Sequence, residues 1–589
     1  MTGNTRLKLP GFGRSLEEFD TGPEAKYCLH ALWDKFQFLS SGVTLREVRM
    51  MEFMNQITDK PEWERKVFDE GIVNKWYEEA MGARSQEMDL DGDVYMSEEM
   101  FDCCIEELRD KAKEYKDTGL ISILDAEVRV VKSDLAIPSS LNDLLKATVK
   151  PLEDVPDHHK DWHPRSNKKV LDLLHPSLFP MVYGTSRVLP YGKVPLSGCA
   201  KFSGSGETYA LPEEERRPRP PYPNLMGSTQ WLPSDVAWAD AGTTKITSYI
   251  NNLHPDDHAE LYSVLEKFVA AAVPLWEHCL FMRRVHSLDP TGISGRRIFA
   301  VTIGNKAFQP PEDDDEDEEE EQRSCYWDGE EEQVGDDWIL TWPEPYYYEN
   351  RTRPVKMRPN LRAEFPDGLQ VIFKLANIHL TPSNPEYEGG SLHIEGALND
   401  RIVATALYYY DCDNITESVL TLYQPVDTEG LRQQAPQNQY ESTERWLGVS
   451  NYEPGLQLLG SVVTREGRFI AFPNVLAHQV KPFKLADNSR PGHRKILAMF
   501  LVDPNFRVLS TSVVPPQRKD WWAREVRDIS PFNRLPTEIF DMIIEFVVDF
   551  LMSWEDALAT REILMEERTM VDAEFDIMMD DNMFNFCEH

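Results

Sequence analysis

The chain has 589 residues, with 100 acidic against 62 basic side chains and a formal net charge of −38. Phosphate recognition needs clustered Lys and Arg, and because no such cluster occurs, the composition argues against a nucleic-acid-binding protein. With 41% hydrophobic and 11% aromatic residues, the chain can bury a large core and is not disordered as a whole. Its length predicts two to four domains, at about one per 150 residues.

Cysteine usage and apolar runs indicate where such a protein resides. The eight cysteines are scattered and form no CxxC pair, which favours reduced thiols over disulfides or structural zinc. The start, MTGNTRLKLPGFGRS, lacks the apolar run of a signal peptide. Acidic residues interrupt the apolar stretch from Ile539 to Met552, which therefore cannot span a bilayer. The sequence predicts a soluble cytoplasmic or nuclear protein without membrane association.

Residues 1–150 predict a helical amino-terminal region. Thr44 and Glu47 have the spacing of a capping box, in which each side chain can bond a free backbone amide of the first turn. Pro61 opens a second helix that continues through Trp76. After Ser97, apolar residues at helical spacing predict a third helix.

Residues 151–290 are rich in Pro and predict a segment that wraps around another element. The run RRPRPPYP at 216–223 is typical of a loop, whereas Asp256 to Ala272 predicts a helix. A loop is also favoured over a zinc site for three nearby imidazoles, those of His158, His159 and His163.

Residues 291–510 change to short β runs separated by turn residues, which indicates an antiparallel sandwich or barrel. The runs begin at Arg297, Leu369, Arg401, Ser418, Leu459, Arg468 and Arg494. Residues 511–589 return to helix, and the apolar segment from Leu535 to Ile544 is expected to pack on the barrel. The fold class is therefore α+β, with a helical region at each end of the chain.

Two segments are strongly acidic: the first is an insertion within the predicted barrel region, and the second is the carboxy-terminal tail. Residues 312–337 carry sixteen acids and one base, and residues 555–589 carry eleven acids and two bases, so together they hold −24 of the net charge. The unbroken acidic run Glu312–Glu321 falls in an insertion at 308–337, where mutual repulsion predicts an extended, disordered loop. A solvated loop is favoured over docking of a basic partner.

The strongest chemical signal is the sequence GGSLHIEG at 389–396. In an extended chain alternate side chains share a face, so His393 and Glu395 can point at one ion while Ile394 turns away. Imidazole together with carboxylate suits ferrous iron. A further imidazole is available from His478, which follows an apolar strand and a short turn.

A basic residue on the next strand fits the same chemistry. Arg494 lies sixteen residues after His478, where its guanidinium could pair with a carboxylate of a bound ligand. Arg490 and His493 lie close by in the sequence and are rivals for this role.

The order His-x-Glu, long gap, His, then Arg resembles the iron(II)- and 2-oxoglutarate-dependent oxygenases. The resemblance implies a double-stranded β-helix core of the jelly-roll or cupin-like type and a metal held on one face by His393, Glu395 and His478. It further implies Fe(2+) and 2-oxoglutarate as cofactors, with Arg494 as the anchor of the distal carboxylate. Arg490 and His493 remain rivals, because Arg494 lies further from His478 than is usual in these oxygenases and Ile496 stands where many of them have Ser or Thr. Because a carboxylate ligand is present, hydroxylation is favoured over halogenation.

Residues near the triad could also bind the cofactor. Tyr387 precedes the first ligand and Lys374 lies on the preceding β run, as does His379, while Tyr408 and Tyr410 alternate on the run after Glu395. Gly389 and Gly390 would allow close backbone approach to a cofactor. For each of these side chains, packing within the sheet is the alternative.

Longer segments resemble the fungal family known as domain of unknown function 4246. They include TLREVRMMEFMNQITDKPEWERKVFDE, YINNLHPDDHAELY, FKLANIHLTPSNPEYEGGSLHIEGALNDRIVATALYYYD and GRFIAFPNVLAHQVKPFKLADNSRPGHRKILAMFLVDP. The similarity runs from about Thr44 to Thr569. It implies a fungal protein without an established substrate, so the oxygenase hypothesis depends on the triad.

Two functions follow from these patterns. The first is an iron- and 2-oxoglutarate-dependent hydroxylase acting on a small-molecule substrate. The alternative is a non-catalytic scaffold that uses the same barrel, with the acidic loop and carboxy-terminal helices as docking surfaces. The sequence leaves the substrate and the oligomeric state open.

Overall fold

The structure of the protein is a computed structural model. This structure describes residues 6–16, 40, 42–82, 96–209, 226–280, 297–298, 331–333, 339–341, 344–345, 359–428, 444, 447–548 and 550–584. The predicted acidic run Glu312–Glu321, and all but the start of the β run at Arg297, lie outside these residues.

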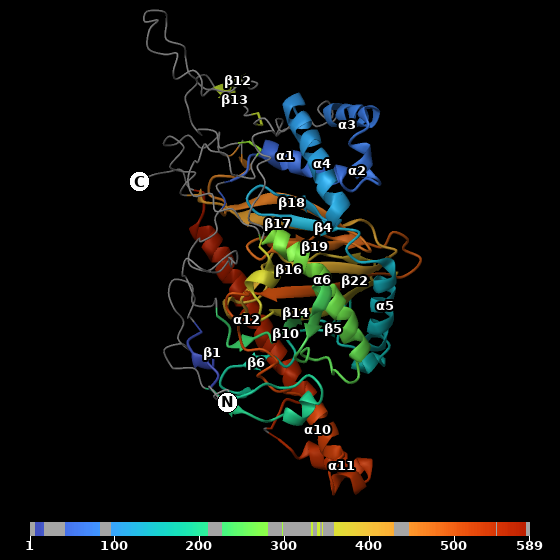
Figure 1. Cartoon of the computed structure of the whole chain (residues 1–589), viewed down its shortest axis with the longest axis vertical. Helices are drawn as coiled ribbons and strands as arrows, with labels where there is room; N and C mark the ends of the chain where they lie inside the picture. The colour runs from blue at the N-terminus through green and yellow to red at the C-terminus, as the bar shows by residue number, and fades with distance from the viewer. Residues whose placement is uncertain are drawn as a thin grey trace, which may run out of the picture.

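Helices gather in the amino-terminal third and at the carboxy-terminal end of the chain, with one long helix between the two groups (Figure 1). The helices are α1 (Leu45–Ile57), α2 (Trp63–Lys66), α3 (Glu70–Gly82), α4 (Glu98–Thr118), α5 (Ser139–Glu153), α6 (Ala259–Cys279), α7 (Leu361–Glu364), α10 (Lys519–Arg527), α11 (Thr537–Glu545) and α12 (Trp554–Asp581). Short 3-10 turns cover Asp157–His159, Cys199–Phe202, Asp240–Gly242, Leu398–Asp400 and Phe532–Arg534.

Strands fill the middle of the chain. The early strands are β1 (Leu9–Pro10), β2 (Gly13–Arg14), β3 (Ile121–Ile123), β4 (Val130–Ser133), β5 (Val170–Leu174), β6 (Met181–Val182), β7 (Arg187–Val188), β8 (Glu207–Thr208), β9 (Thr229–Gln230), β10 (Ser234–Trp238) and β11 (Thr244–Ile246). The later strands are β12 (Glu331–Gln333), β13 (Ile339–Thr341), β14 (Leu369–Leu380), β15 (Glu386–Tyr387), β16 (Ile402–Asp413), β17 (Ser418–Pro425), β18 (Leu456–Thr464), β19 (Phe469–Pro473), β20 (Ala477–Val480), β21 (Phe483–Lys484) and β22 (Gly492–Val502).

The centre of the molecule is a nine-stranded antiparallel sheet. Its order is β11-β10-β14-β22-β16-β19-β4-β3, and β5 pairs with β14 beside this path. The pairing of β14 with β22 runs from Val371 opposite Leu501 to Leu380 opposite Gly492. Strands from before residue 291 therefore extend a sheet whose centre comes from residues 369–502.

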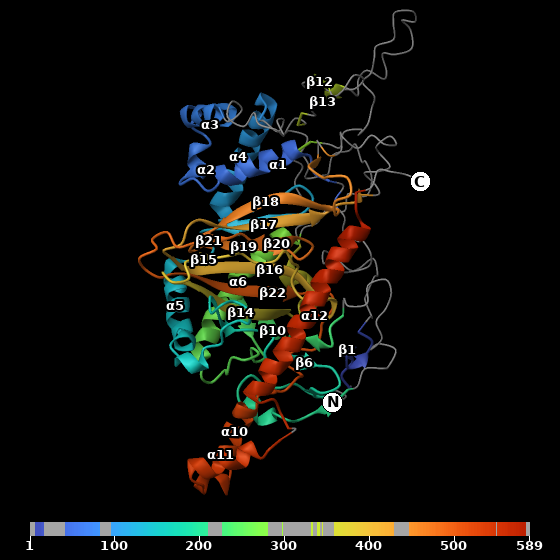
Figure 2. The same ribbon diagram turned by 180° about the vertical axis from the view of Figure 1, so that it is seen from behind.

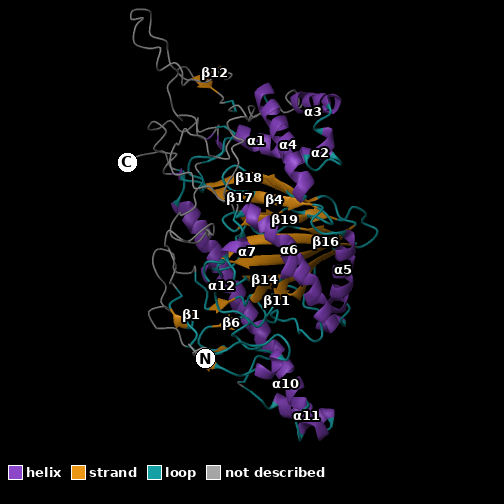
Figure 3. Ribbon diagram, in the orientation of Figure 1, coloured by secondary structure: helices purple, strands orange, loops and turns teal. Residues whose placement is uncertain are grey.

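A smaller antiparallel sheet has the order β18-β17-β20, and β15 pairs with β21 nearby. An isolated antiparallel bridge between His393 and His478 joins the segment before β16 to β20. From β14 to β22 the chain passes back and forth between the two sheets, with β17 and β18 adjacent in the small one. It is a mixed helical and antiparallel β protein, as predicted (Figure 3).

Helix α6 covers one face of the large sheet. Alternate residues of β14, including Phe373 and Leu375, share a buried cluster with α6, and the Phe268 ring lies 5.0 Å from that of Tyr408. The helix continues past its predicted end at Ala272, through Pro274, to Cys279. Burial of the apolar side chains after Pro274 offsets the hydrogen bond that proline removes.

The amino-terminal helices pack on the small sheet and on β3 and β4. Thr44 is the N-cap of α1, and its hydroxyl accepts a hydrogen bond from the Glu47 N–H at 3.2 Å, which confirms the Thr44 half of the predicted capping box. The Glu47 carboxylate accepts a hydrogen bond from the backbone N–H of Arg297 at 2.6 Å. The segment after Pro61 forms two helices rather than one, because α2 ends at Lys66 before α3 begins. Met51 and Met54 of α1 share a buried cluster with Leu422 of β17.

The carboxy-terminal helices divide into two positions. Helix α12 crosses the molecule beside the strands, on the side opposite α6 (Figure 2). Its residues Val571 and Phe575 pack with Ile394 and Ala477, next to the predicted metal ligands. Helix α11 lies at one end of the molecule, away from both sheets (Figures 1 and 2). The expectation that Leu535–Ile544 packs on the barrel is therefore wrong.

Within the described ranges, no helix combines the length and apolarity that crossing a bilayer requires.

Candidate metal centre

The three residues predicted as a triad lie together. His393 and Glu395 come from the segment between β15 and β16, and His478 comes from β20. One nitrogen of each imidazole and one carboxylate oxygen lie within 4.8 Å of one another. The Glu395 Oε1 atom is 3.4 Å from Nε2 of His478 and 3.9 Å from Nε2 of His393. Residues up to 85 positions apart in the sequence thus present three potential ligand atoms to one point.

The tautomer of His393 suits a metal ligand. Its Nδ1 lies 2.9 Å from the carbonyl oxygen of Ser391, and because a carbonyl can only accept, Nδ1 carries the proton. The Nε2 lone pair is then free and points toward Glu395. This arrangement, with the outer nitrogen donating to a backbone carbonyl, is typical of metal-binding histidines.

His478 is held between the two sheets. It is opposite Leu422 of β17, and its ring packs 4.9 Å from that of Phe472 on β19 of the large sheet. Its Nδ1 is buried and has no hydrogen-bond partner in the described part of the chain. The side chain therefore presents Nε2 to Glu395 from a fixed, nearly water-free position.

The backbone around Glu395 is fixed by a side chain that sequence reasoning missed. The Oδ1 atom of Asn474 accepts a hydrogen bond from the Glu395 N–H at 2.9 Å, and the Nδ2–H of Asn474 donates one to the Glu395 carbonyl at 2.8 Å. A second Nδ2–H donates to the carbonyl of Ile402 at 2.9 Å. Asn474 is fully buried, so these bonds are shielded from water and hold the carboxylate-bearing residue in register.

The electrostatics keep the carboxylate charged. Burial opposes ionisation of Glu395, but the hydrogen bond with His478 and the nearby charges of His393, His478 and Lys374 outweigh it and lower its pKa to about 2. Burial, with the charge of His478, also lowers the pKa of His393. An ionised carboxylate and a neutral His393 imidazole are protonation states that suit metal binding.

Arg494 reaches from the large sheet to the small one. Its guanidinium donates to the hydroxyl of Ser418 on β17 and lies 3.4 Å from that of Thr464 on β18. It also lies over the rings of Tyr409, at 5.5 Å, and Phe483, at 4.9 Å. Only 1% of Arg494 is exposed, and no carboxylate pairs with it among the described residues. A buried guanidinium bonded only to hydroxyl groups can still form an ion pair with the carboxylate of a bound ligand.

The rivals of Arg494 point to other partners. Arg490 is half exposed and pairs with Asp413 at 2.6 Å. His493 lies 3.0 Å from Asp411 through its Nε2. By contrast, the predicted Tyr387 lies beside Arg494: its ring is 5.1 Å from that of Phe483, and the charge of Arg494 acts to lower its pKa, although burial raises that pKa overall.

Lys374 faces the triad. Its neighbours Phe373 and Leu375 pack toward α6, so alternation turns Lys374 to the other side of the sheet. Its charge lowers the pKa values of Glu395 and of Asp172 on β5. The ammonium group is half-buried, and it has neither a hydrogen bond nor an ion pair with any residue that the structure describes.

Several neighbouring candidates face elsewhere. Tyr408 and Tyr410 belong to the cluster under α6, and Tyr409 between them faces Arg494 instead. His379 lies opposite His493 on the strand pair β14 and β22. Gly389 approaches a protein carbonyl, since a Cβ there would lie 2.7 Å from the oxygen of Val480.

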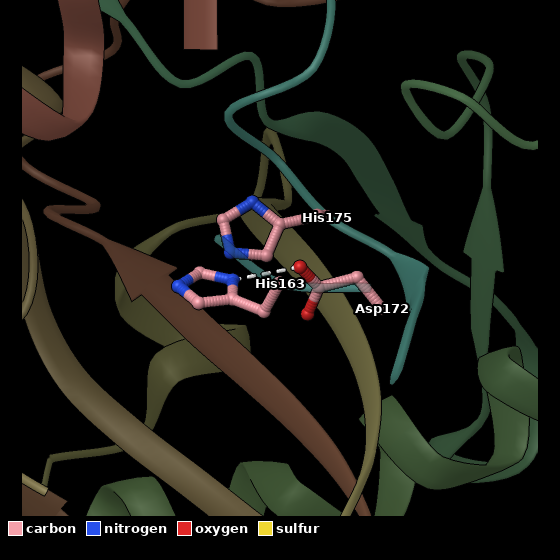
Figure 4. A group of neighbouring side chains, drawn as sticks. All are labelled: His163, Asp172 and His175. Atoms are coloured by element: carbon pink, nitrogen blue, oxygen red, sulfur yellow. Dashed lines mark hydrogen bonds and ion pairs between the residues drawn. The ribbon is translucent and has the colours of Figure 1, made fainter. Parts of the chain in front are cut away.

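A second group of potential ligands lies on and beside β5. His163, Asp172 and His175 bring one ligand atom each within 4.8 Å (Figure 4). Nδ1 of His163 lies 2.8 Å from Oδ2 of Asp172, drawn as the dashed line in Figure 4. The sequence predicts a loop at His163, and Asp172 and His175 carry no spacing that marks them beforehand.

The hydrogen bonds of this second group do not suit a metal. Nδ1 of His175 accepts the backbone N–H of Ser177 at 3.2 Å, so in the neutral ring the proton sits on Nε2, the atom that faces the group. Asp172 is also close to two cations, since Arg561 lies 3.9 Å away and the charge of Lys374 acts on it. The group is better described as a buried carboxylate neutralised by its neighbours.

Comparisons with known proteins give small overlaps with solved structures. The IDO from Bacillus thuringiensis matches at 11% identity over 23% of this chain and 47% of its own, with a TM-score of 0.14. The Fe(II)/(alpha)ketoglutarate-dependent dioxygenase TqaL matches at 13% identity over 24% and 47%, with a TM-score of 0.15. A bsmA homolog from Methylobium petroleophilum PM1 matches at 11% identity over 28% and 57%, with a TM-score of 0.14. The chain thus spans about half the length of these proteins.

Family comparison covers far more of the chain. No curated protein matches it. The model described as "Protein of unknown function (DUF4246)" matches residues 98–525, and that of the "Domain of unknown function DUF4246, N-terminal" matches residues 9–79. These matches cover most of the sequence and include all three residues of the triad. The chain therefore belongs to the DUF4246 family, as its motifs predict.

Proposed function

We propose that this protein is an iron(II)- and 2-oxoglutarate-dependent oxygenase that hydroxylates a small molecule. The observation that carries the proposal is the convergence of two imidazole nitrogens and one carboxylate oxygen, from His393, His478 and Glu395, on one point between two sheets. Two His and one carboxylate on one face of a metal form the ligand set typical of non-haem iron oxygenases.

The strand order supports a double-stranded β-helix as the core. Strands β14, β22, β16 and β19 are consecutive in the large sheet, and β20, β17 and β18 in the small one. Along the chain, the connections pass repeatedly from one sheet to the other, and the bridge at His393 adds the segment after β15 to the edge of β20. Eight chain segments divided between two facing sheets, with repeated crossings from one sheet to the other, are expected of a jelly roll.

The ligand separations fit a metal after a small contraction. Nitrogen and oxygen ligands lie about 2.0–2.2 Å from such an ion, so two ligands at a right angle are about 3 Å apart. The observed 3.4 and 3.9 Å exceed this by less than 1 Å. His393, Glu395 and His478 would hold the iron, and the Ser391 carbonyl and Asn474 would keep two of these ligands oriented.

The cations around the triad fit a dicarboxylate cosubstrate. Arg494 would pair with the distal carboxylate of 2-oxoglutarate, with Ser418 and Thr464 holding the guanidinium and Tyr387 beside it. Lys374 would neutralise the carboxylate nearer the metal, because its charge already acts on Glu395 and it forms no ion pair with the residues that the structure describes. Burial of Arg494 strengthens the pairing by excluding water.

Bound iron and 2-oxoglutarate would supply the oxidation, since the cosubstrate and dioxygen yield succinate and CO2 while one oxygen atom enters the substrate. The protein's own residues bind, orient and exclude water. Retention of Glu395 as a ligand favours hydroxylation over halogenation, which needs that position for a halide.

Anaerobic titration with ferrous iron, followed by measurement of succinate from 2-oxoglutarate in air, tests the proposal. The wild-type protein should bind one iron per chain and form succinate, and His393→Ala and His478→Ala should lose both. His163→Ala is the matched control, because His163 belongs to the second group and should leave iron binding unchanged. If the wild type binds no iron, or binds it as well after either triad substitution, the scaffold alternative replaces the enzyme.

A further inference from the structure

Helix α11 presents an apolar stripe to solvent. Ile539, Met542 and the C-cap residue Phe546 follow one another at spacings of three and four, and because Phe546 keeps helical backbone angles the three lie on one side of the helix. They are 45%, 53% and 81% exposed. The apolar side of a surface helix normally packs against the rest of the protein, so an apolar stripe that faces solvent is unusual.

The opposite side of α11 is already anchored. Phe540 is buried, with its ring 6.2 Å from that of Phe532 and under the guanidinium of Arg527 at 4.8 Å. The Arg527 guanidinium also donates to the carbonyl of Leu535 at 3.0 Å. The helix is therefore fixed on a small support formed by the end of α10 and the turn Phe532–Arg534. The exposed stripe is a surface on an ordered element.

An acidic row borders the stripe. Glu538, Asp541 and Glu545 each precede a stripe residue by one position, which rotates them about 100° to one side of it. All three are exposed, and none has an ion-pair partner in the part of the chain that the structure describes. From Thr537 to Val548 the sequence contains no Lys or Arg. The edge of the surface therefore carries three acidic side chains without an ion pair among the described residues, while Arg527 and Lys519 bond to the two ends of the helical segment.

We propose that the stripe of Ile539, Met542 and Phe546 docks an amphipathic helix of another protein whose apolar face is edged by Lys or Arg. The apolar side chains would supply the buried contact, and the acidic row would select the basic edge and set its orientation. Self-association through this stripe is disfavoured, because a second α11 would bring three further acids to the same contact.

The test uses the full chain and a synthetic three-heptad helix with Leu along one face and Lys along the edges, together with a twin in which every Lys is Glu. In fluorescence anisotropy, the Lys peptide should bind about tenfold or more tighter than its Glu twin. The double substitution Met542→Ser and Phe546→Ser should weaken Lys-peptide binding by about a hundredfold. The triple substitution Glu538→Gln, Asp541→Asn and Glu545→Gln should remove the preference for Lys.

The matched control substitutes two exposed leucines elsewhere, Leu135→Ser and Leu144→Ser, and should leave peptide binding unchanged. Equal binding of the two peptides, or binding unaffected by the Met542→Ser and Phe546→Ser changes, overturns the proposal. Two further results would also overturn the proposal, because each would assign the stripe to a different occupant. One is a wild-type dimer in sedimentation that the Met542→Ser and Phe546→Ser changes dissociate. The other is binding of the wild type to phosphatidylcholine vesicles that these changes abolish.

Discussion

His393 and His478 are bonded to each other through their backbones. The N–H of His393 donates to the carbonyl of His478 at 3.1 Å, and the N–H of His478 donates back at 2.9 Å. The imidazole centroids are consequently 4.4 Å apart. Two proposed ligands from distant parts of the chain are therefore paired by main-chain geometry, which would reduce the ordering that metal binding must supply.

Gly389 should be needed to extend this pairing, whereas Gly390 should not. The Gly390 N–H donates to the Val480 carbonyl at 3.0 Å, and Gly389 has a φ of +93°. A Cβ at Gly389 would meet the Val480 oxygen at 2.7 Å, but one at Gly390 would meet no atom within 4 Å. Gly389→Ala should cost about 1–3 kcal/mol of folding free energy and weaken iron binding. Gly390→Ala should change both little, as urea unfolding and iron titration can check; equal effects would contradict the assignment.

Asn474 should control metal affinity without touching the metal. Asn474→Ala removes the acceptor for the Glu395 N–H and the donor for its carbonyl, so the carboxylate loses its fixed position. Loss of such an orienting partner typically lowers metal affinity about 10- to 100-fold. Asn474→Asp keeps the acceptor and loses the donor, and should fall between the wild type and Asn474→Ala in an iron titration. If all three proteins bind iron alike, the clamp has no role in the site.

Arg494 should determine cosubstrate binding. Arg494→Gln keeps most of the side chain's bulk between Tyr409 and Phe483 but removes its charge, and should weaken 2-oxoglutarate binding about 10- to 100-fold. Arg490→Gln is the control, because Arg490 pairs with Asp413 at the surface. Calorimetric titration of the iron-loaded proteins separates the two. A loss confined to Arg490→Gln would reassign the anchor.

The sequence predicts much of the site because its signals are local. Residues His393 and Glu395 are two apart in an extended segment, and the position of His478 follows from an apolar strand that ends in a turn. Arg494 is identifiable because it opens the next strand. The main β runs and the helices at both ends are predicted for the same reason, since each depends on periodicity within one segment.

Other features depend on contacts between distant segments and have no local signal. Asn474 resembles any turn residue until the fold places it beside Glu395. The contribution of β5 and β10 to the large sheet depends on pairing with β14, which periodicity cannot specify. Tyr409, and not Tyr408 or Tyr410, lies beside Arg494 because α6 covers the other face of β16, and the sequence does not show which face is covered. Helix α11 was expected on the barrel because its apolar pattern does not reveal which surface it meets.

Asp172 should make folding stability depend on pH in the acid range. Burial opposes its ionisation, but His175, the hydrogen bond from His163 and the charge of Lys374 outweigh this and lower its pKa to about 2, from 3.8. Since the folded state holds the charged form more tightly, the stabilisation is fully present above about pH 4 and is lost as pH falls toward 2. The shift corresponds to about 2 kcal/mol. Asp172→Asn, which still accepts a hydrogen bond from His163, should be less stable than the wild type at pH 5, with the gap narrowing at pH 4 and pH 3 in urea unfolding. The exposed substitution Asp240→Asn should show no such trend, and a gap for Asp172→Asn that stays constant with pH would exclude the coupling.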